Sequence, residues 1–481
     1  MTRPARASRH AGVMDAVFPQ PLAGPAPASD RAEARALFAL AAPLVGANLL
    51  QMAVYAIDVM FVARLGTVEF AAATLGVFLY SVIMWAMIGL TGACAPLIAA
   101  ELGRRRHAVR QVRRTFRMAM WLGVVGSIPF LLLLAHGEDV LLLAGQDPAV
   151  AVRTGDFLDI LLLCLIPGVL GGIMRTAAAA LGRPNWALIV TAAALLVGLL
   201  GNWLLVFGNL GFPALGLEGS AIASLVTVLV MAVAYAAILA FDPAIRRYRL
   251  FGRWWRTEWS RFAEIVRLGA PIALTMTLEG ALFGGAAFLM GLIGVTEVAA
   301  HAIALNIAAI AFQVPFGIGQ AATIRVGMAY GARDPAWMGR AGRVAIVAGT
   351  GFMLVTASAI WLAPRLFVSA YIDVADPANA AVVLLAVQYL AVAAVFQLFD
   401  GAQAVTAGVL RGVQDTRVPM IIAGLGYWVA GFGTAVVFGF ALDWQGLGIW
   451  IGLAVGLVVV SALLLWRWRA RERLGLVRGT A

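Results

Sequence analysis

Residues 267–334 read RLGAPIALTMTLEGALFGGAAFLMGLIGVTEVAAHAIALNIAAIAFQVPFGIGQAATIRVGMAYGARD. Between Leu268 and Ile293 the only formal charge is that of Glu279. A helix of this length, rising about 1.5 Å per residue, crosses a hydrocarbon core of about 30 Å and places Glu279 near its middle. Because an isolated carboxylate costs about 3 kcal/mol or more there, a protein that keeps one is expected to use it.

The same stretch repeats an earlier one at an offset of 228 residues, without gaps. The landmarks that coincide are Ala42-Pro43 with Ala270-Pro271, Gly66 with Gly294, Glu69 with Glu297, Ala71-Ala72 with Ala299-Ala300, and Gly103 with Gly331. The chain is therefore predicted to be two copies of one helical unit. The copies differ where chemistry is expected, because Gln51 is replaced by Glu279 and Asp58 by Ala286.

The composition is that of a polytopic membrane protein, with 62% hydrophobic and 12% charged residues. The net charge of +11 comes from 35 basic residues, all of them arginine. Apolar segments predict twelve membrane helices. They cover about 36–63, 74–100, 117–135, 157–181, 187–208, 217–241, 268–293, 298–324, 344–363, 382–410, 418–440 and 446–466. We expect the segment 382–410 to bend or tilt, because it contains Asp400, Gly401 and Gly408.

The arginines outside the segments or at their ends predict the orientation. With the N-terminus inside, 32 of them fall on the inner side and only Arg64, Arg153 and Arg365 on the outer side. By the positive-inside rule both termini are cytoplasmic. The expected organisation is a disordered tail (1–33), a six-helix bundle (34–241), a cytoplasmic linker (242–267), a second six-helix bundle (268–466) and a cytoplasmic tail (467–481).

Arginine and tryptophan alternate in the linker, around Trp254, Trp255 and Trp259. This pattern could indicate nucleic-acid binding, but packing at the lipid interface is the better explanation, so we expect a lipid partner and no nucleic acid. The sequence contains no recognisable catalytic motif, so we expect neither an enzyme nor a cofactor.

Three acids lie inside the predicted spans: Glu279, Asp400 and, closer to the outer surface, Asp58. Each could simply be held by a neighbouring helix. Burial of a carboxylate also favours uptake of a proton, or binding of a cation such as Na⁺, and Glu279 and Asp400 are the candidate ligands. The supporting polar residues are Asn202, Gln51, Gln397, Gln403 and Thr275, and the candidate substrate-cavity residues are Tyr55, Phe283, Phe396 and Gln313. Asn202 could join Asp58 in binding a cation if their helices meet.

Four segments carry a family resemblance: APLVGANLLQMAVYAIDVMFVARLG, GNWLLVFGNLGFPALGLEGSAIAS, AAHAIALNIAAIAFQVPFGIGQAATIRVGMAYGARD and GVLRGVQDTRVPM. Over about Leu37–Trp466 the chain resembles the multidrug and toxic compound extrusion (MATE) transporters, in particular their NorM-like branch. The resemblance implies an all-α integral membrane protein with twelve transmembrane helices in two pseudo-symmetric six-helix bundles.

The resemblance also implies export of amphipathic, often cationic organic compounds in exchange for Na⁺ or H⁺. The family's coupling acids correspond to Glu279, Asp400 and Asp58. The chain departs from relatives at Gly198, where asparagine is common, and at Phe396, where some sodium-coupled members have tyrosine. We therefore expect a monomeric antiporter of the bacterial inner membrane. The alternative is a lipid or lipid-linked oligosaccharide flippase of related architecture.

Overall fold

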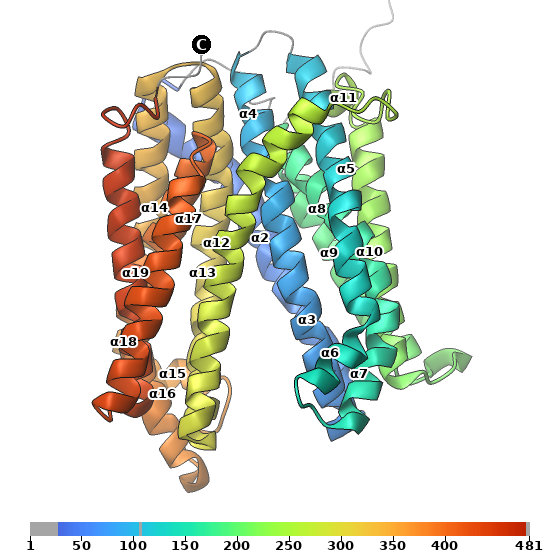
Figure 1. Ribbon diagram of the computed structural model, residues 1–481, viewed down its shortest axis with the longest axis vertical. Coiled ribbons are helices and arrows are strands. Elements are labelled where there is room, and N and C mark those ends of the chain that lie inside the picture. The colour runs from blue at the N-terminus through green and yellow to red at the C-terminus, as the bar shows by residue number, and fades with distance from the viewer. Residues whose placement is uncertain (1–26, 105–107, 478–481) are drawn as a thin grey trace, which may run out of the picture. The chain divides into compact units, whose positions relative to one another are not determined.

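A computed structural model describes residues 27–104 and 108–477 and divides them into two compact units. Unit 1 comprises Ala39–Arg267, and unit 2 comprises Pro27–Phe38 together with the chain from Leu268 onward. Within the described part of the chain, twelve helical segments are long and apolar enough to cross a membrane (Figure 1).

The first repeat begins with α2, which starts in unit 2 and continues in unit 1. Its membrane helices and the short helices that connect them are α2 (Asp30–Val62), α3 (Thr67–Gly92), α4 (Cys94–Arg104), α5 (Ala108–Ala135), α6 (Gly137–Leu143), α7 (Pro148–Leu161), η1 (Leu162–Cys164), α8 (Leu165–Ala180), α9 (Asn185–Leu205), η2 (Asn209–Gly211), α10 (Gly216–Phe241) and α11 (Pro243–Arg246).

The second repeat begins with α12, which starts in unit 1 and continues in unit 2. Its elements are α12 (Trp259–Ile293), α13 (Val295–Gly331), α14 (Pro335–Leu362), α15 (Pro364–Val368), η3 (Pro377–Asn379), α16 (Ala380–Gly412), α17 (Arg417–Gly424), η4 (Leu425–Phe432), α18 (Gly433–Val436), η5 (Val437–Ala441) and α19 (Gln445–Arg469). The segments from α17 to η5 form one spanning helix, Arg417–Ala441, with two π-helical stretches.

The repeat predicted from the sequence is confirmed in the local structure. Gly66 and Gly294 are the N-cap residues of α3 and α13, which begin the second helix of each repeat. In both places the glutamate three residues later folds back toward the glycine. An added Cβ on Gly66 would lie 3.0 Å from a carboxylate oxygen of Glu69, and one on Gly294 would lie 2.5 Å from that of Glu297.

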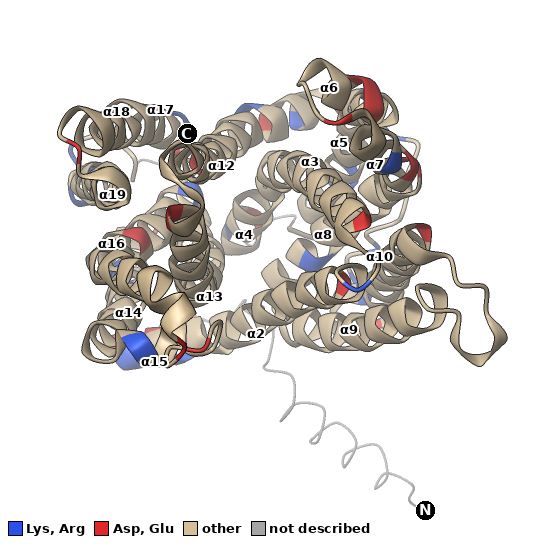
Figure 2. Cartoon of the chain, turned by 90° about the horizontal axis from the view of Figure 1, so that it is seen from below, with Lys and Arg blue, Asp and Glu red and all other residues tan. Residues whose placement is uncertain are grey.

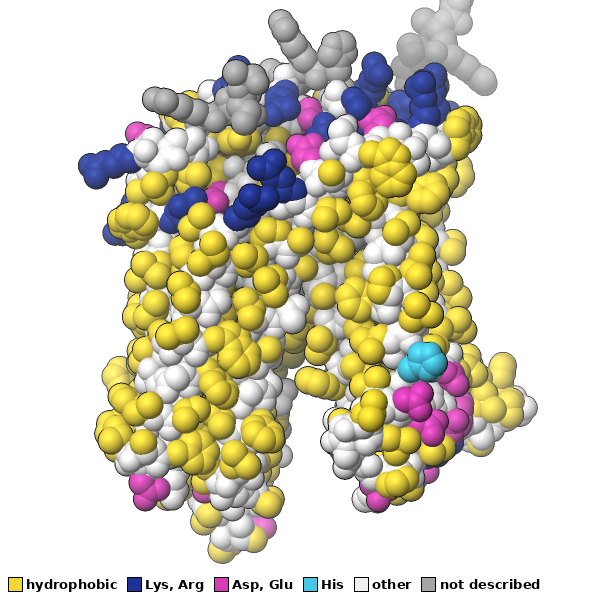
Figure 3. All heavy atoms as spheres, in the orientation of Figure 1, with side chains coloured by type: hydrophobic (Ala, Val, Ile, Leu, Met, Phe, Trp, Pro, Cys, Tyr) yellow, Lys and Arg dark blue, Asp and Glu magenta, His cyan; other side chains and the backbone are white. Residues whose placement is uncertain are grey.

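The surface of each unit fits a bilayer. Figure 3 shows hydrophobic side chains along the helices, with arginines gathered at one end and acidic side chains at both ends. Figure 2 looks along the helices and shows that most of the helical ribbon carries no charged residue. Apolar side chains on the lipid-facing surface cost nothing in a membrane, since lipid and side chain are equally apolar.

Small residues allow the helices of unit 2 to pack closely. An added Cβ on Gly408 of α16 would lie 2.4 Å from the carbonyl oxygen of Gly319 on α13. Thr323 donates a hydrogen bond of 2.8 Å to the carbonyl oxygen of Gly408. The helix α16 runs without interruption from Ala380 to Gly412, so its glycines serve close packing; the expected bend does not break the helix.

Segment boundaries differ from the expected ones. Helix α2 begins at Asp30 and Glu33 is fully buried, so the expected tail over 1–33 ends before these residues; residues 1–26 lie outside the described part. The expected linker 242–267 belongs to unit 1, and α12 begins within it at Trp259. At the other end, α19 continues to Arg469, inside the expected tail 467–481. The segments were predicted from hydropathy alone. Hydropathy does not detect the paired charges and packed aromatic rings that extend the helices beyond the apolar segments.

Candidate functional site

Helix α16 carries a buried polar face in the middle of unit 2. Gln397, Asp400 and Gln403 are spaced three residues apart, which places them along one side of the helix. All three are buried, with exposed fractions of 0%, 4% and 3%. This polar face therefore points into the protein and not into lipid.

This face has unused hydrogen-bonding capacity. Among the described residues, Oδ1 of Asp400, Oε1 of Gln403 and both side-chain polar atoms of Gln397 have no hydrogen-bond partner. Buried polar atoms in folded proteins are nearly always paired. Carboxylate and amide oxygens are also the ligands that hard cations prefer. The residues thus fit a bound Na⁺ or a proton on Asp400.

Glu279 on α12 belongs to the same electrostatic environment. Its charge interacts with those of Asp400 and Arg411, both on α16, and with Tyr427 in the π-helical stretch η4. Glu279 is half-buried and Tyr427 is fully buried. Two acids, one arginine and one phenol therefore share a region of low dielectric, in which gain or loss of one positive charge affects all of them.

A small cavity of about 10 Å³ is lined in part by Arg411, and its size suits about one water molecule. Thr275 of α12 and Gln403 and Arg411 of α16 contribute polar groups to its lining. The structure thus brings together two of the predicted supporting residues, Thr275 and Gln403. The Thr275 hydroxyl also donates to the carbonyl oxygen of Pro271 at 2.8 Å.

Phe283 and Phe396, two of the candidate substrate-cavity residues, belong to an aromatic cluster. The rings of Phe283 and Phe396 have centroids 6.2 Å apart, and Phe396 lies 5.8 Å from Trp450, both in edge-to-face geometry. Tyr389 and His301 also contact Trp450. Phe396 is 1% exposed, so its ring packs in the interior of unit 2, whereas Phe283 is half-buried.

Unit 1 contains a second polar cluster, around Asp58 of α2. The Asn202 amide Nδ2 of α9 donates to Oδ1 of Asp58 at 2.7 Å, and the Ser224 hydroxyl of α10 donates to its Oδ2 at 3.1 Å. The helices of Asp58 and Asn202 thus meet, which is the condition for the two residues to bind a cation together. Asn202 is fully buried, and its Oδ1 has no partner among the described residues, so it could join the carboxylate in holding a cation.

The remaining predicted residues are less closely involved. Gln51 is half-buried and Tyr55 is 45% exposed. Gln313 is half-buried and donates to the carbonyl oxygen of Ala309, on its own helix. Gly198 has room beside it: an added Cβ would lie 3.5 Å from the Thr227 hydroxyl.

Three residues of these clusters were missing from the sequence-based prediction. Ser224 lies in a largely apolar helix that also carries Ser220 and Thr227, so its hydroxyl is a weak signal. Arg411 was counted as a loop residue, but it lies in the last turn of α16 and lines the cavity. Tyr427 had no signal, because its proximity to Glu279 depends on how the π-helical stretch packs.

Two repeated six-helix bundles, each with an intramembrane acid among buried amides or hydroxyls, define the class as a multi-pass membrane transporter. The MatE family model matches residues 43–204 and 271–437, and the two matches start 228 residues apart. The chain belongs to the MatE family, the multidrug and toxic compound extrusion transporters, and to its NorM-like branch.

Similar proteins agree over nearly the whole length. The chain is 48% identical to a probable multidrug resistance protein NorM of Mesorhizobium japonicum, covering 92% of this chain and 95% of the relative. The crystal structure of a mutant of the Vibrio cholerae MATE transporter VcmN superposes with a TM-score of 0.84 at 18% identity, covering 93% and 99% of the two chains. The eukaryotic MATE transporter AtDTX14 gives a TM-score of 0.82 at 23% identity, covering 94% and 100%.

Proposed function

We propose that the protein is an antiporter that exports amphipathic, cationic organic compounds in exchange for Na⁺ or H⁺. It resides as a monomer in the bacterial inner membrane with both termini in the cytoplasm. Membership of the family and similarity to multidrug resistance proteins support export of drugs. The observation that carries the coupling is Asp400, buried with an unpartnered carboxylate oxygen, within the electrostatic reach of Glu279.

The chemistry follows from the burial of these acids. An ionised carboxylate in a low-dielectric interior is costly, and a bound Na⁺ or proton removes most of that cost. Cation binding at Asp400 and Glu279 therefore stabilises one state of unit 2, and the ion-free acids favour another. An organic cation that prefers the ion-free state is exchanged for the inorganic one, because only differential affinity shifts populations.

Asp58 is the candidate for a second cation site, in unit 1. Its carboxylate already accepts bonds from Asn202 and Ser224, which stabilise the ionised form. One positive charge that moves inward across 100 mV releases about 2.3 kcal/mol, which supports a concentration gradient of about fifty-fold.

The experiment uses the purified protein in proteoliposomes with an enclosed fluorescent organic cation. An imposed Na⁺ gradient, a pH gradient alone and no gradient are compared. The proposal expects gradient-driven movement of the dye with one of the two ions. The alternative, a flippase, would move a fluorescent lipid across the bilayer and leave the dye where it is; that result would replace the proposal.

The orientation has its own test. Single cysteines replace Arg249 in the linker and Asp373 before η3, both of them exposed, in a Cys94→Ala, Cys164→Ala background. A membrane-impermeant maleimide applied to intact spheroplasts should label the cysteine at 373 and not the one at 249. The reverse pattern would place the termini outside.

A further inference from the structure

Ion pairs hold the start of the first helix of each repeat, and we call these ion pairs anchors. They lie at equivalent positions of the two repeats. Adding 228 to 30 and 33 gives 258 and 261. Asp30 and Glu33 begin α2, while Glu258 and Arg261 stand at the start of α12. All four side chains form ion pairs, and each pair joins the first helix of one repeat to a helix of the other repeat.

The inner anchor of α2 is Glu33. Arg325 of α13 donates to both of its carboxylate oxygens at 2.7 Å, through Nε and Nη2. The Trp337 indole of α14 donates to Oε2 at 3.0 Å, and the guanidinium lies 5.3 Å from the centroid of that ring. The side chains of Glu33 and Arg325 are 1% and 4% exposed, so water does not compete for this bidentate pair.

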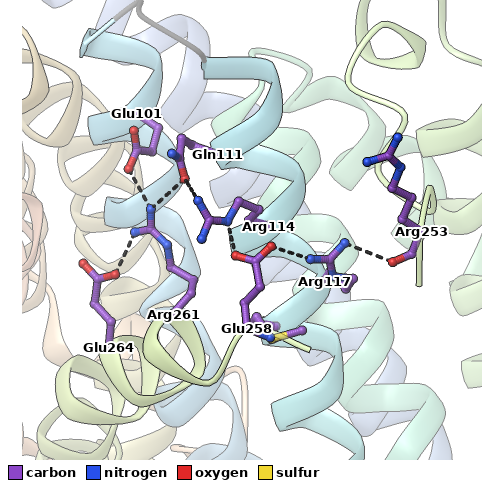
Figure 4. A network of polar contacts seen from close by, with 9 residues as sticks. Glu101, Gln111, Arg114, Arg117, Arg253, Glu258, Arg261 and Glu264 are labelled. Carbon is purple, nitrogen blue, oxygen red and sulfur yellow. Dashed lines mark hydrogen bonds and ion pairs between the residues drawn. The ribbon is translucent and has the colours of Figure 1, made fainter. Parts of the chain in front are cut away.

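The inner anchor of α12 is Arg261, with the charges reversed (Figure 4). Its Nη2 donates to Glu101 of α4 at 3.0 Å and to Gln111 of α5 at 3.2 Å, while Nη1 donates to Glu264 at 2.7 Å. Glu101 and Arg261 are 6% and 13% exposed. Both inner anchors thus bind the second helix of the other repeat.

The outer anchors repeat the same design on the third helix of the other repeat. Asp30 binds Arg343 at 2.8 Å and Arg340 at 3.5 Å, both on α14. Glu258 binds Arg117 at 2.8 Å and also Arg114, both on α5, as Figure 4 shows. In each case an acid at the start of the first helix meets two arginines that are three residues apart.

Both first helices change unit soon after their anchors. Helix α2 passes from unit 2 to unit 1 between Phe38 and Ala39, and α12 passes from unit 1 to unit 2 between Arg267 and Leu268. These crossings lie about one and a half to two turns beyond Glu33 and Arg261. Pro43 and Pro271, inside the helices, have no N–H to bond the carbonyl four residues earlier, at positions 39 and 267. Each helix therefore bends most easily where it passes from one unit to the other.

We propose that the two inner anchors, Glu33–Arg325 and Arg261–Glu101, stay formed throughout the transport cycle. They act as the fixed ends of α2 and α12. A movement of either unit is then taken up as bending of the helix that carries Asp58 or Glu279. The anchors thereby couple the movement of the units to the acids that hold the cation. This role rests on the proposed antiport, and it makes Glu33, Arg325, Arg261 and Glu101 positioning residues.

The main test crosslinks each anchor. One variant carries Glu33→Cys and Arg325→Cys, and a second carries Glu101→Cys and Arg261→Cys, both in the cysteine-free background. A short bifunctional methanethiosulfonate then joins the two cysteines of each pair. The control pair replaces Asp415 and Arg467, an ion pair within the second repeat that is similarly buried. We expect both crosslinked anchors to transport the dye within about twofold of the crosslinked control. A loss of tenfold or more, reversed by reduction, would mean that the anchors must open, and would overturn the proposal.

Neutral variants test the coupling itself. With Glu33→Gln or Arg261→Gln, we expect downhill dye flux to continue while the dye gradient built by a fixed ion gradient falls about tenfold. An unchanged gradient would contradict the positioning role.

Hydrogen–deuterium exchange separates this proposal from the proposed function. If the wild-type protein transports no dye, the antiport fails, but the anchors can still be examined. We expect the amide exchange of segments 30–38 and 258–267 to change less than twofold between Na⁺-loaded, acidified and ion-poor conditions. A tenfold acceleration in either segment would show that its anchor opens.

Discussion

Asn202 donates a hydrogen bond of 2.7 Å to the carboxylate of Asp58, 144 positions earlier in the chain, and keeps its own amide oxygen buried and unpartnered. An acid and an amide on two membrane helices thus point their oxygens into one small region. The two side chains are the candidate ligands of the cation site proposed for unit 1. It lies in the repeat that lacks an equivalent of Glu279, so the two repeats hold their acids at different depths.

Replacement of Asp58 tests the site in unit 1. Asp58→Asn should reduce ion-driven dye transport at least tenfold, because the amide has no charge to attract the cation. Asn202→Ala should reduce it less, since the carboxylate and Ser224 remain. Asn209→Ala is the matched control, because this asparagine bonds a backbone carbonyl in an exposed turn. Wild-type transport by Asp58→Asn would remove Asp58 from the mechanism.

Gly408→Ala should destabilise unit 2. The added Cβ would approach the carbonyl oxygen of Gly319 to 2.4 Å, and backbone atoms cannot move aside as a flexible side chain does. Overpacking of this kind costs about 1–3 kcal/mol. Thermal unfolding in detergent measures it, as a fall of several degrees in Tm.

The control for this prediction is Gly351→Ala on α14, where an added Cβ meets no atom within 4 Å. Alanine favours helix over glycine by about 1 kcal/mol, so Tm should stay the same or rise slightly. Equal Tm values for the two variants would show that α13 and α16 do not pack as closely as described.

The buried ion pair of Glu33 gives a stability prediction that is independent of transport. Glu33→Gln leaves the Arg325 charge buried without a counter-charge, which costs about 3–5 kcal/mol. Asp30→Asn, in a pair whose acid is 55% exposed, should cost at most about 1 kcal/mol. Chemical unfolding compares the two variants. A smaller loss for Glu33→Gln than for Asp30→Asn would contradict the burial of this pair.

Much of the fold was predictable from the sequence, because its signals are local or periodic. Apolar length predicted the twelve helices, and the equal spacing of Gly66 with Glu69 and of Gly294 with Glu297 predicted the repeat; both predictions are confirmed. Gln397, Asp400 and Gln403, which the sequence named as candidates, are all buried on α16.

The anchors and parts of the two clusters could not be predicted in this way. Glu33 meets Arg325, 292 residues later, and no local pattern marks an acid at the end of a helix as buried. The linker was expected to pack at the lipid interface, and nothing in its sequence showed that Trp121 and Arg117 donate to its backbone carbonyls at Trp254 and Arg253. Ser224 and Tyr427 contribute through tertiary packing alone.

The coupling role of the two acids in unit 2 is tested most directly by ion-driven dye transport in proteoliposomes containing Glu279→Gln or Asp400→Asn. The matched control is Asp139→Asn, an acid with a 73% exposed side chain. We predict that each of the two buried substitutions lowers gradient-driven transport at least tenfold while the control transports at the wild-type rate. Wild-type rates from both Glu279→Gln and Asp400→Asn would contradict the account.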